Sequence, residues 1–264
     1  MVFLHVKYTI MSKINLRYQF FDFDDNILKT DTTISILSED GLKDVSTEEY
    51  ARLMHDIENT KIEHHDKSFH EFSDDGPRGD YAFHQDATVA LNNKNYSASF
   101  LDLIDCIKGG HLFAIVTARS HSVNTLKKWF RFLIEFYLTD EEKKEMIANL
   151  NKYCEVFGQE LPEDYLEHYL NKCYFYPVSN PELNLPKQIE EAKRVVVEKL
   201  VNNIYDYYLT VADKVHKVKI GFSDDSKSNI EKVTTLFKSL KERYKPIKFY
   251  IFDTSLGIKI KHKI

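Results

Sequence analysis

Short apolar runs rich in Ile, Val, Phe and Tyr alternate along the chain with longer segments whose apolar residues recur at helical spacing. The strand-like runs are residues 16–23, 112–117, 173–178, 218–222 and 247–252. Strands separated by helices in this manner predict an α/β protein with a mainly parallel, Rossmann-like sheet. Polar or acidic residues follow most of these strands, at the sheet edge where ligands of such folds bind.

The segments between the predicted strands carry their own signals. Residues 32–45 alternate in polarity and turn at Asp40-Gly41, which predicts a β-hairpin. Residues 46–49 have the Ser-x-x-Glu spacing of a capping box, which predicts the start of a helix. Further helices are predicted at residues 100–107, 123–138, 140–157, 163–170 and from 187 onward.

One long polar stretch does not fit this alternation. Residues 59–95 contain turn-forming residues and scattered histidines, and we expect them to be irregular and outside the core. Together with the predicted helix before it, this stretch is interpreted as a cap-like insertion at residues 47–95. The α/β core then comprises residues 11–46 and 96–264, including a helical insertion at about 122–172.

The amino-acid composition excludes some classes of binding site. The chain has 264 residues, a formal net charge of -5 and only 8 Gly, from which neither G-x-G-x-x-G nor G-x-x-x-x-G-K-[ST] can be assembled. If the protein binds phosphate, other groups must hold the anion. Its 3 Cys are widely spaced and lack C-x-x-C, as in a reduced, cytoplasmic protein. No apolar run reaches the roughly 18 to 20 residues of a membrane span, so no membrane partner is expected.

The strongest chemical signal lies where the first predicted strand ends. The sequence Phe-Phe-Asp-Phe-Asp-Asp-Asn places Asp22, Asp24 and Asp25 close together after an apolar run. Neighbouring carboxylates repel one another, which suggests a bound cation or a raised pKa. A solvated acidic turn would have the same local pattern, so this motif alone does not decide between the two interpretations.

Two other strand ends favour the cation. Asp224 and Asp225 follow the strand at 218–222, and acidic ends of neighbouring parallel strands suit Mg²⁺, which prefers carboxylate and water oxygens. The strand at 112–117 ends in residues that offer a hydroxyl and a guanidinium to an anionic substrate. These predicted substrate-binding residues are Thr117, Ala118 and Arg119.

In this order, the motifs resemble the haloacid dehalogenase-like superfamily of phosphohydrolases. The resemblance rests on D-x-D after the first strand, Thr117 after the second, and the Asp-Asp pair with a downstream Asn229. It covers the core strands from about residue 16 to 253, and the predicted hairpin lies where this family has its flap. The resemblance implies cap insertions that cover the active site and an aspartyl-phosphate intermediate.

The resemblance also implies a role for each matched residue. Asp22 is the expected nucleophile, and Asp24 the expected general acid and base. Mg²⁺ is expected to be held by Asp22, by the backbone carbonyl of Asp24 and by Asp224, with Asp225 close by. Thr117 is expected to hydrogen-bond a phosphoryl oxygen.

A lysine from the helix before the fourth strand is expected to neutralise the phosphate and Asp22. Lys187, which opens this helix, is the preferred candidate, and Lys193 is the alternative. The chain departs from the family at one point: many members have Gly-Thr after the second aspartate, where it has Asp25 and Asn26. This departure affects the expected turn geometry and catalytic efficiency, whereas both catalytic aspartates are present.

Three weaker signals each have two interpretations. The histidines of the insert lack the spacing of a metal site and are interpreted as surface residues: His64, His65, His70 and His84. Arg119 either contacts substrate or forms a structural ion pair. The segment 238–263 is rich in Lys and Arg, and it is interpreted as a solvated basic edge, with contact to nucleic-acid phosphates as the less favoured alternative.

The sequence therefore predicts a Mg²⁺-dependent phosphatase of the haloacid dehalogenase type, acting on a small phosphomonoester such as a nucleotide or sugar phosphate. One alternative moves the same chemistry to phosphorylated nucleic-acid ends, with residues 238–263 as the docking surface. The other alternative is a catalytically silent binding protein with the same fold. Asp22, Asp24 and Asp224 favour catalysis, because an acidic cluster without a function would only cost stability.

Overall fold

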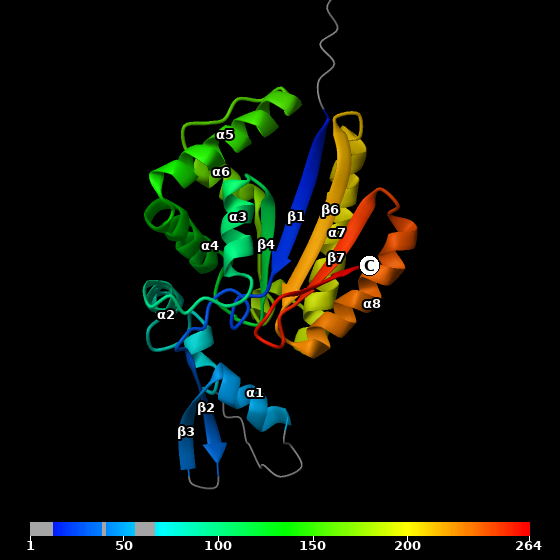
Figure 1. The fold of residues 1–264 in the computed structure, drawn as a ribbon. Coiled ribbons are helices and arrows are strands. Elements are labelled where there is room, and N and C mark those ends of the chain that lie inside the picture. The colour runs from blue at the N-terminus through cyan, green and yellow to red at the C-terminus, as the bar shows by residue number, and fades with distance from the viewer. Residues whose placement is uncertain (1–12, 39–40, 56–66) are drawn as a thin grey trace, which may run out of the picture.

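A six-stranded sheet forms the centre of the molecule, with strands in the order β5-β4-β1-β6-β7-β8 (Figure 1). The computed structural model of the protein describes residues 13–38, 41–55 and 67–264. The strands of this sheet are β1 (Ile14–Phe21), β4 (Leu112–Thr117), β5 (Tyr174–Pro177), β6 (Val215–Asp224), β7 (Ile247–Asp253) and β8 (Ile260–Lys263). All pairs are parallel except the last, in which β8 runs antiparallel to β7. The predicted α/β class with a mainly parallel, Rossmann-like sheet is confirmed.

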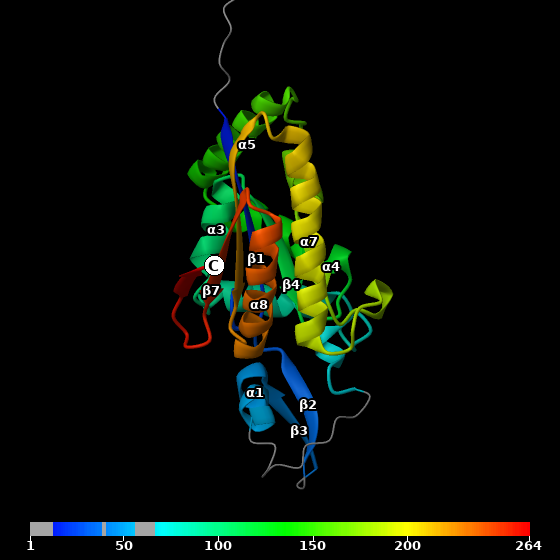
Figure 2. The ribbon, with the colours of Figure 1, turned by 90° about the vertical axis from the view of Figure 1, so that its right-hand side faces the viewer.

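Helices lie on both sides of the sheet (Figure 2). On one side are α7 (Ile189–Val211) and α8 (Lys227–Arg243). On the other side are α3 (Phe100–Lys108), α4 (Val123–Phe132) and α6 (Tyr165–Lys172), and α5 (Asp140–Phe157) packs against α3. A π-helical segment, Leu133–Tyr137, continues α4, and 3₁₀ turns occur at His70–Phe72 and Pro181–Leu183. In the described part of the chain, no helix is long and apolar enough to cross a membrane.

Two apolar clusters hold these layers together. Leu16, Tyr18 and Phe20 of β1 are buried in the cluster beneath α7 and α8, whereas Phe21 belongs to the cluster beneath α3 and α4. Side chains along a strand point alternately to its two sides, and on the side opposite to Leu16, Tyr18 and Phe20 the strand carries the polar residues Asn15, Arg17 and Gln19. The first strand is therefore apolar on one side along most of its length, and on both sides only at Phe20 and Phe21, directly before the carboxylates.

Most elements predicted from periodicity are confirmed, with shifts of a few residues at their ends. Helix α5 has the predicted bounds, and Thr139 and Glu142 form its capping box. The hairpin also forms, from β2 (Thr33–Ser38) and β3 (Gly41–Ser46). Strand β8 was not predicted, because its side chains are exposed and mostly charged.

The prediction that residues 59–95 are irregular and outside the core is wrong for part of this stretch. Tyr81–Asn92 forms α2, whose Phe83 and Leu91 are buried in the same cluster as β1 and α4. Half of the buried residues of α2 are alanines and one is Asp86, so its apolar stripe is weak in the sequence. His84 on this helix is half-buried against Phe132, with ring centroids 4.9 Å apart. His70 is also half-buried, while His64 and His65 lie outside the described residues.

The hairpin and α1 (Thr47–His55) form a small unit below the carboxyl ends of the strands (Figure 1). Ile34, Ile36 and Val45 of the hairpin pack with Phe72 in a separate apolar cluster. The Thr47 hydroxyl donates a hydrogen bond of 2.7 Å to Asp25, directly after the first strand. The unit is therefore attached next to the acidic strand end.

Candidate functional site

The candidate site lies at the carboxyl edge of the sheet, at the point where the strand order reverses. From the central β1, the chain builds β4 and β5 on one side and then returns to build β6 and β7 on the other. Such a switch point leaves a crevice outside the strand ends, where ligands of open α/β sheets bind. Asp22, Thr117 and Asp224 stand at the ends of the three adjacent strands β1, β4 and β6. The backbone N–H of Asp22 donates to the Ser223 carbonyl at 2.9 Å, which fixes the two acidic ends side by side.

Three carboxylates meet at this edge. Oxygens of Asp22, Asp224 and Asp225 all lie within 4.8 Å of one another. Asp22 and Asp224 are buried, with 8% and 0% of their surface exposed. The Asn229 amide donates to both oxygens of Asp224, at 3.0 and 3.1 Å, so Asp224 is held in one orientation.

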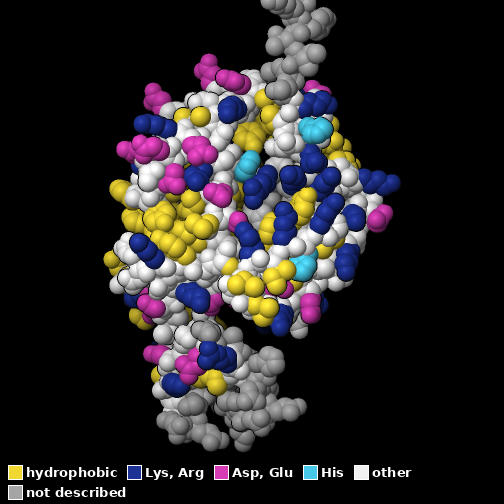
Figure 3. Space-filling model, in the orientation of Figure 1, with side chains coloured by type: hydrophobic (Ala, Val, Ile, Leu, Met, Phe, Trp, Pro, Cys, Tyr) yellow, Lys and Arg dark blue, Asp and Glu magenta, His cyan; other side chains and the backbone are white. Residues whose placement is uncertain are grey.

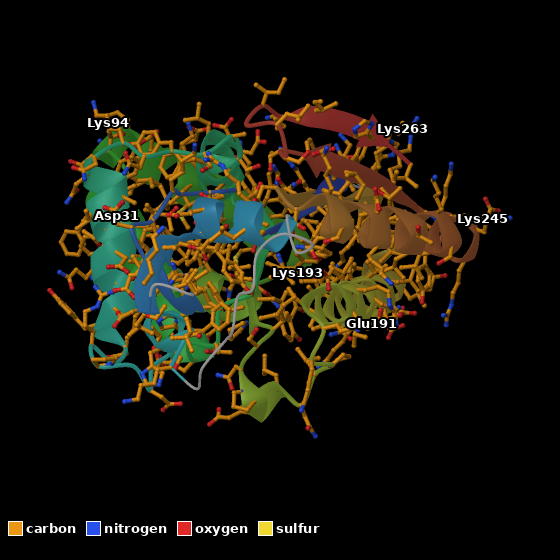
Figure 4. The ribbon with its side chains drawn as sticks, turned by 90° about the horizontal axis from the view of Figure 1, so that it is seen from below. Asp31, Lys94, Glu191, Lys193, Lys245 and Lys263 are labelled. Atoms are coloured by element: carbon orange, nitrogen blue, oxygen red, sulfur yellow. The ribbon has the colours of Figure 1, made fainter. Side chains whose placement is uncertain are left out.

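A single lysine bridges two of these carboxylates. Lys193 Nζ lies 3.0 Å from Asp22 Oδ1 and 2.8 Å from Asp224 Oδ2, and its side chain is only 1% exposed. Lys193 extends from α7 toward this edge and lies near the middle of the view from below (Figure 4). The structure thus brings Lys193 to the acidic cluster and leaves Lys187, the preferred candidate from sequence, exposed in the link before α7. Helix α7 begins at Ile189, two residues after Lys187, so Lys187 lies outside the helix. Lys193 lies about one turn into the helix, among its buried residues.

Burial dominates the electrostatics of the cluster. It raises the pKa of Asp22 well above its ordinary value; the charge of Lys193 opposes this rise, and Asp224 adds to it. Burial and the neighbouring Asp224 also raise the pKa of Asp225, to about 7. For Lys193, burial alone would lower the pKa, but the charges of Asp22 and Asp224 outweigh it and raise the pKa above its usual value.

These features fit a bound divalent cation. The cluster places three carboxylates within 4.8 Å of one another, and Lys193 contacts two of them, Asp22 and Asp224. Because the donors are carboxylate oxygens only, they suit a hard cation such as Mg²⁺ or Ca²⁺ better than a thiolate- or imidazole-preferring metal. The side chain of Asp24 is not part of this cluster.

The side chain of Asp24 is held elsewhere, by Arg119. Arg119 Nε donates to Asp24 Oδ2 at 2.8 Å, and its Nη2 donates to Oδ1 at 2.7 Å. The Thr30 hydroxyl donates to the same Oδ1 at 2.9 Å. Arg119 is fully buried, and its guanidinium lies 4.7 Å from the centre of the Phe72 ring. Of the two interpretations of Arg119 from sequence, the structure shows the ion pair.

This ion pair continues into a buried polar network that sequence reasoning missed. Arg119 Nη2 also donates to the Thr32 hydroxyl, which donates to Asp86 at 2.7 Å. Arg78 donates to both oxygens of Asp86, at 2.7 and 2.9 Å. The network joins the D-x-D motif to the base of the hairpin and to α2. Its members are far apart in the sequence, so no local spacing could have revealed it.

The two residues that depart from the family pattern have structural roles. Asp25 adopts a left-handed backbone with φ of 56°, a conformation that glycine adopts without strain. Asn26 is fully buried, and its amide N–H group donates to the carbonyls of Asp22 and Ser223 at 3.1 and 3.2 Å. Its Oδ1 accepts hydrogen bonds from three hydroxyls, those of Ser99, Ser223 and Thr254. Asn26 therefore joins the strand ends around the acidic cluster.

The remaining predicted residues lie at the end of β4. Thr117 is 1% exposed, and its hydroxyl oxygen accepts a hydrogen bond of 3.3 Å from the Arg119 backbone N–H. The hydroxyl proton of Thr117 thus stays available to an acceptor at the strand end. Ala118 is exposed between them.

Fold and site together define an α/β protein with a Rossmann-like, mostly parallel sheet and a buried acidic cluster at its switch point. Comparison of the chain with protein-family models, with curated proteins and with solved structures finds no significant match. The geometry of this site is therefore the basis on which a function can be assigned to the chain.

Proposed function

We propose that the protein is a Mg²⁺-dependent phosphatase that hydrolyses a small phosphomonoester through an aspartyl-phosphate on Asp22. The observation that carries this proposal is the position of Lys193 between Asp22 and Asp224 at the switch point. A buried lysine shared by two strand-end carboxylates is costly to maintain, because each of the three charges loses its hydration. Binding of a phosphate and a cation gives such a cluster a function.

Asp22 is the proposed nucleophile because it is the carboxylate that a phosphoryl group can approach at the end of the central strand. Attack requires the ionised form, and burial works against it. The charge of Lys193 at 3.0 Å opposes protonation of Asp22 and also attracts the negatively charged substrate. The Thr117 hydroxyl would donate to a phosphoryl oxygen at the same strand edge.

Mg²⁺, when bound between Asp22, Asp224 and Asp225, would supply positive charge to the phosphoryl oxygens and orient the ester for attack. The chain prepares this site by fixing the Asp224 carboxylate through Asn229 and the backbone N–H of Ser226. Metal binding and protonation then compete for Asp225, whose raised pKa of about 7 reflects its burial and the charge of Asp224.

Asp24 would give a proton to the leaving oxygen and later take one from water. Arg119 sets its side-chain orientation through two hydrogen bonds, at 2.7 and 2.8 Å. When Asp24 carries the proton, its carboxyl group is neutral and the ion pair with Arg119 is weakened. Proton transfer is therefore coupled to the strength of the Arg119–Asp24 contact. The hairpin unit hydrogen-bonds the same motif through Thr47 and is the proposed cover that excludes water and selects the substrate.

The decisive experiment is hydrolysis of p-nitrophenyl phosphate by the purified full-length protein, with Mg²⁺ or with EDTA. We expect turnover with Mg²⁺ only, and a loss of at least about 100-fold for Asp22→Asn. Asp253→Asn is the matched control, because Asp253 ends the next strand at the same edge and pairs with Asp224 in register. Equal turnover by Asp22→Asn and the native protein would overturn the nucleophile, and turnover that survives EDTA would overturn the cation.

A second candidate is a binding protein that holds a cation and a phosphorylated ligand without turnover. One observation favours it: both oxygens of Asp24 already accept hydrogen bonds, two on Oδ1 from Arg119 and Thr30 and one on Oδ2 from Arg119, which leaves little acceptor capacity for a leaving group. Calorimetric titration with Mg²⁺ and inorganic phosphate separates the two. Binding that is lost in Asp224→Asn, together with no turnover of any phosphomonoester tested, would support the binding protein.

A further inference from the structure

One face of the sheet is only half covered by helices. On the side of α3 and α4, these helices pack on β4 and β5. Over β6, β7 and β8 no helix of the described chain lies on that side (Figures 1 and 2). An open sheet face of this kind is exposed to solvent, so its side chains show what kind of partner it suits.

Strand alternation identifies the side chains on this open area. Along β7, Ile247, Phe249 and Ile251 are buried in the cluster beneath α8, so the residues between them point to the open side. The same alternation holds for β1 and β6, and pairing with β7 places the facing residues of β8. We call the resulting set the basic sheet face: Arg17, Lys217, Lys219, Lys248, Tyr250, Phe252, Lys261 and Lys263.

Positive charge is concentrated on this face. Lys219 pairs in register with Arg17 on one side and with Lys248 on the other. Like charges placed opposite one another in a sheet destabilise it. In the part of the chain that the structure describes, no ion pair joins the cations of the basic sheet face to an acid, whereas the neighbouring Lys259 is paired with Asp102 at 2.6 Å.

The distribution of charge over the surface makes the same point. In Figure 3, Lys and Arg side chains crowd the area over β6, β7 and β8, while acidic side chains lie mostly over the helices to the left. Figure 4 shows Lys263 on the side of the sheet opposite to Glu191 of α7. Because the whole chain has a net charge of -5, this basic area reflects segregation of charge and not the overall composition.

Two aromatic rings lie among these cations. Tyr250 and Phe252 are half-buried, and Lys261 Nζ lies above them, 4.7 Å and 5.5 Å from the ring centres. Gly221 of β6 lies next to the Phe252 ring, and a Cβ atom on Gly221 would come within 2.8 Å of this ring. The glycine thus lets this ring lie against β6, and the face stays shallow.

We propose that the basic sheet face binds single-stranded nucleic acid. Its cations would contact successive phosphates, and a base would stack on Tyr250 while Lys261 moves from the ring to a phosphate. Partly accessible rings between cations favour a single strand, because the bases of a duplex are already stacked and hidden. Such binding relieves the repulsion between Lys219 and its neighbours, and it is independent of the proposed phosphatase activity.

The test is fluorescence anisotropy of a short labelled oligothymidine, titrated with the full-length protein at several salt concentrations. We expect binding that weakens with salt. The double variant Lys248→Glu with Lys263→Glu should weaken it at least about tenfold and lower the salt slope by about 1.4, since each phosphate contact of a single strand contributes about 0.7. The matched control is Lys238→Glu with Lys241→Glu, which makes the same charge change on exposed residues of α8, on the opposite side of the sheet.

A second variant tests the stacking. Tyr250→Leu keeps the charge, and we expect it to weaken binding of the oligothymidine by about tenfold while leaving the residual binding of a duplex of equal length unchanged. Any of three results would overturn the proposal: no binding of the oligothymidine at low salt, equal losses in the α8 control, or duplex, heparin or anionic vesicles bound as tightly as the single strand. Circular dichroism of each variant distinguishes a lost contact from a lost fold.

Discussion

Arg119 and Asp24 form a bidentate ion pair, with N···O distances of 2.8 and 2.7 Å, although the two residues lie on different strand ends. The guanidinium is fully buried, whereas the carboxylate side chain is 16% exposed. Removing one partner of such a pair leaves a charge without compensation, which costs more than the pair contributes in net stability.

Arg119→Met should lower the free energy of unfolding by about 3 kcal/mol, measured by urea denaturation. The double variant Arg119→Met with Asp24→Asn should lose less than Arg119→Met alone, because it removes both charges together. If the double variant loses as much free energy of unfolding as Arg119→Met or more, the two charges do not couple as the geometry requires.

Lys193→Met should destabilise the protein by about 3 kcal/mol near pH 7.5, because it leaves Asp22 and Asp224 facing each other without a cation. The charge of Lys193 holds down the pKa of Asp22, which is already raised by burial, so its removal raises this pKa further. The folded variant then binds a proton more readily than the unfolded chain, and the loss should shrink as the pH falls toward about 5.5.

The matched control for this prediction is Lys199→Met, since Lys199 lies on the same helix but is exposed. Its loss should stay within about 0.5 kcal/mol. A loss in Lys193→Met that does not depend on pH would show that the lysine does not set the ionisation of Asp22.

Asn26→Ala should lower the free energy of unfolding by roughly 3 kcal/mol, because it removes a buried amide that bonds two carbonyls and three hydroxyls. Thr254→Val removes only one of these bonds and should cost about 1 kcal/mol. Urea denaturation of both variants provides the measurement. Equal losses in the two would mean that Asn26 is not the centre of the network.

The free energy of unfolding should also decrease at acid pH because of His121. Burial lowers the pKa of His121 to about 4, and the charge of Arg119 adds to this effect. Below a pH of about 6.5 this histidine binds a proton in the unfolded chain but stays neutral in the folded protein. The free energy of unfolding therefore decreases as the pH falls from about 6.5 to about 4. The contribution of this residue is up to roughly 3 kcal/mol.

His121→Leu should flatten the dependence of the unfolding free energy on pH in this window. Part of the slope should remain, because His111 is also partly buried and has a pKa lowered to about 4 by burial. Parallel curves for the variant and the native protein would contradict the role of His121.

Much of the fold follows from local pattern. The apolar runs became strands β1, β4, β5, β6 and β7, and the capping box at Thr139 set the start of α5. The sequence also indicated that Asp22, Thr117 and Asp224 would share one edge, because parallel strands place their carboxyl ends together. Helix α2 was not predicted because half of its buried residues are alanines and one is Asp86. The cation, the nucleophile and the phosphatase activity remain predictions.

What the sequence by itself determined is therefore the strands, their polar ends and the carboxylates gathered there. Only the tertiary structure decided which basic side chain forms an ion pair with each acid. Lys193 rather than Lys187 pairs with Asp22, and Arg119 pairs with Asp24. The physical reason is range. Periodicity and caps depend on neighbours in the chain, whereas the partner of a buried charge is selected among chemically equivalent residues by long-range packing, which leaves only one of them close enough to offset the cost of burial.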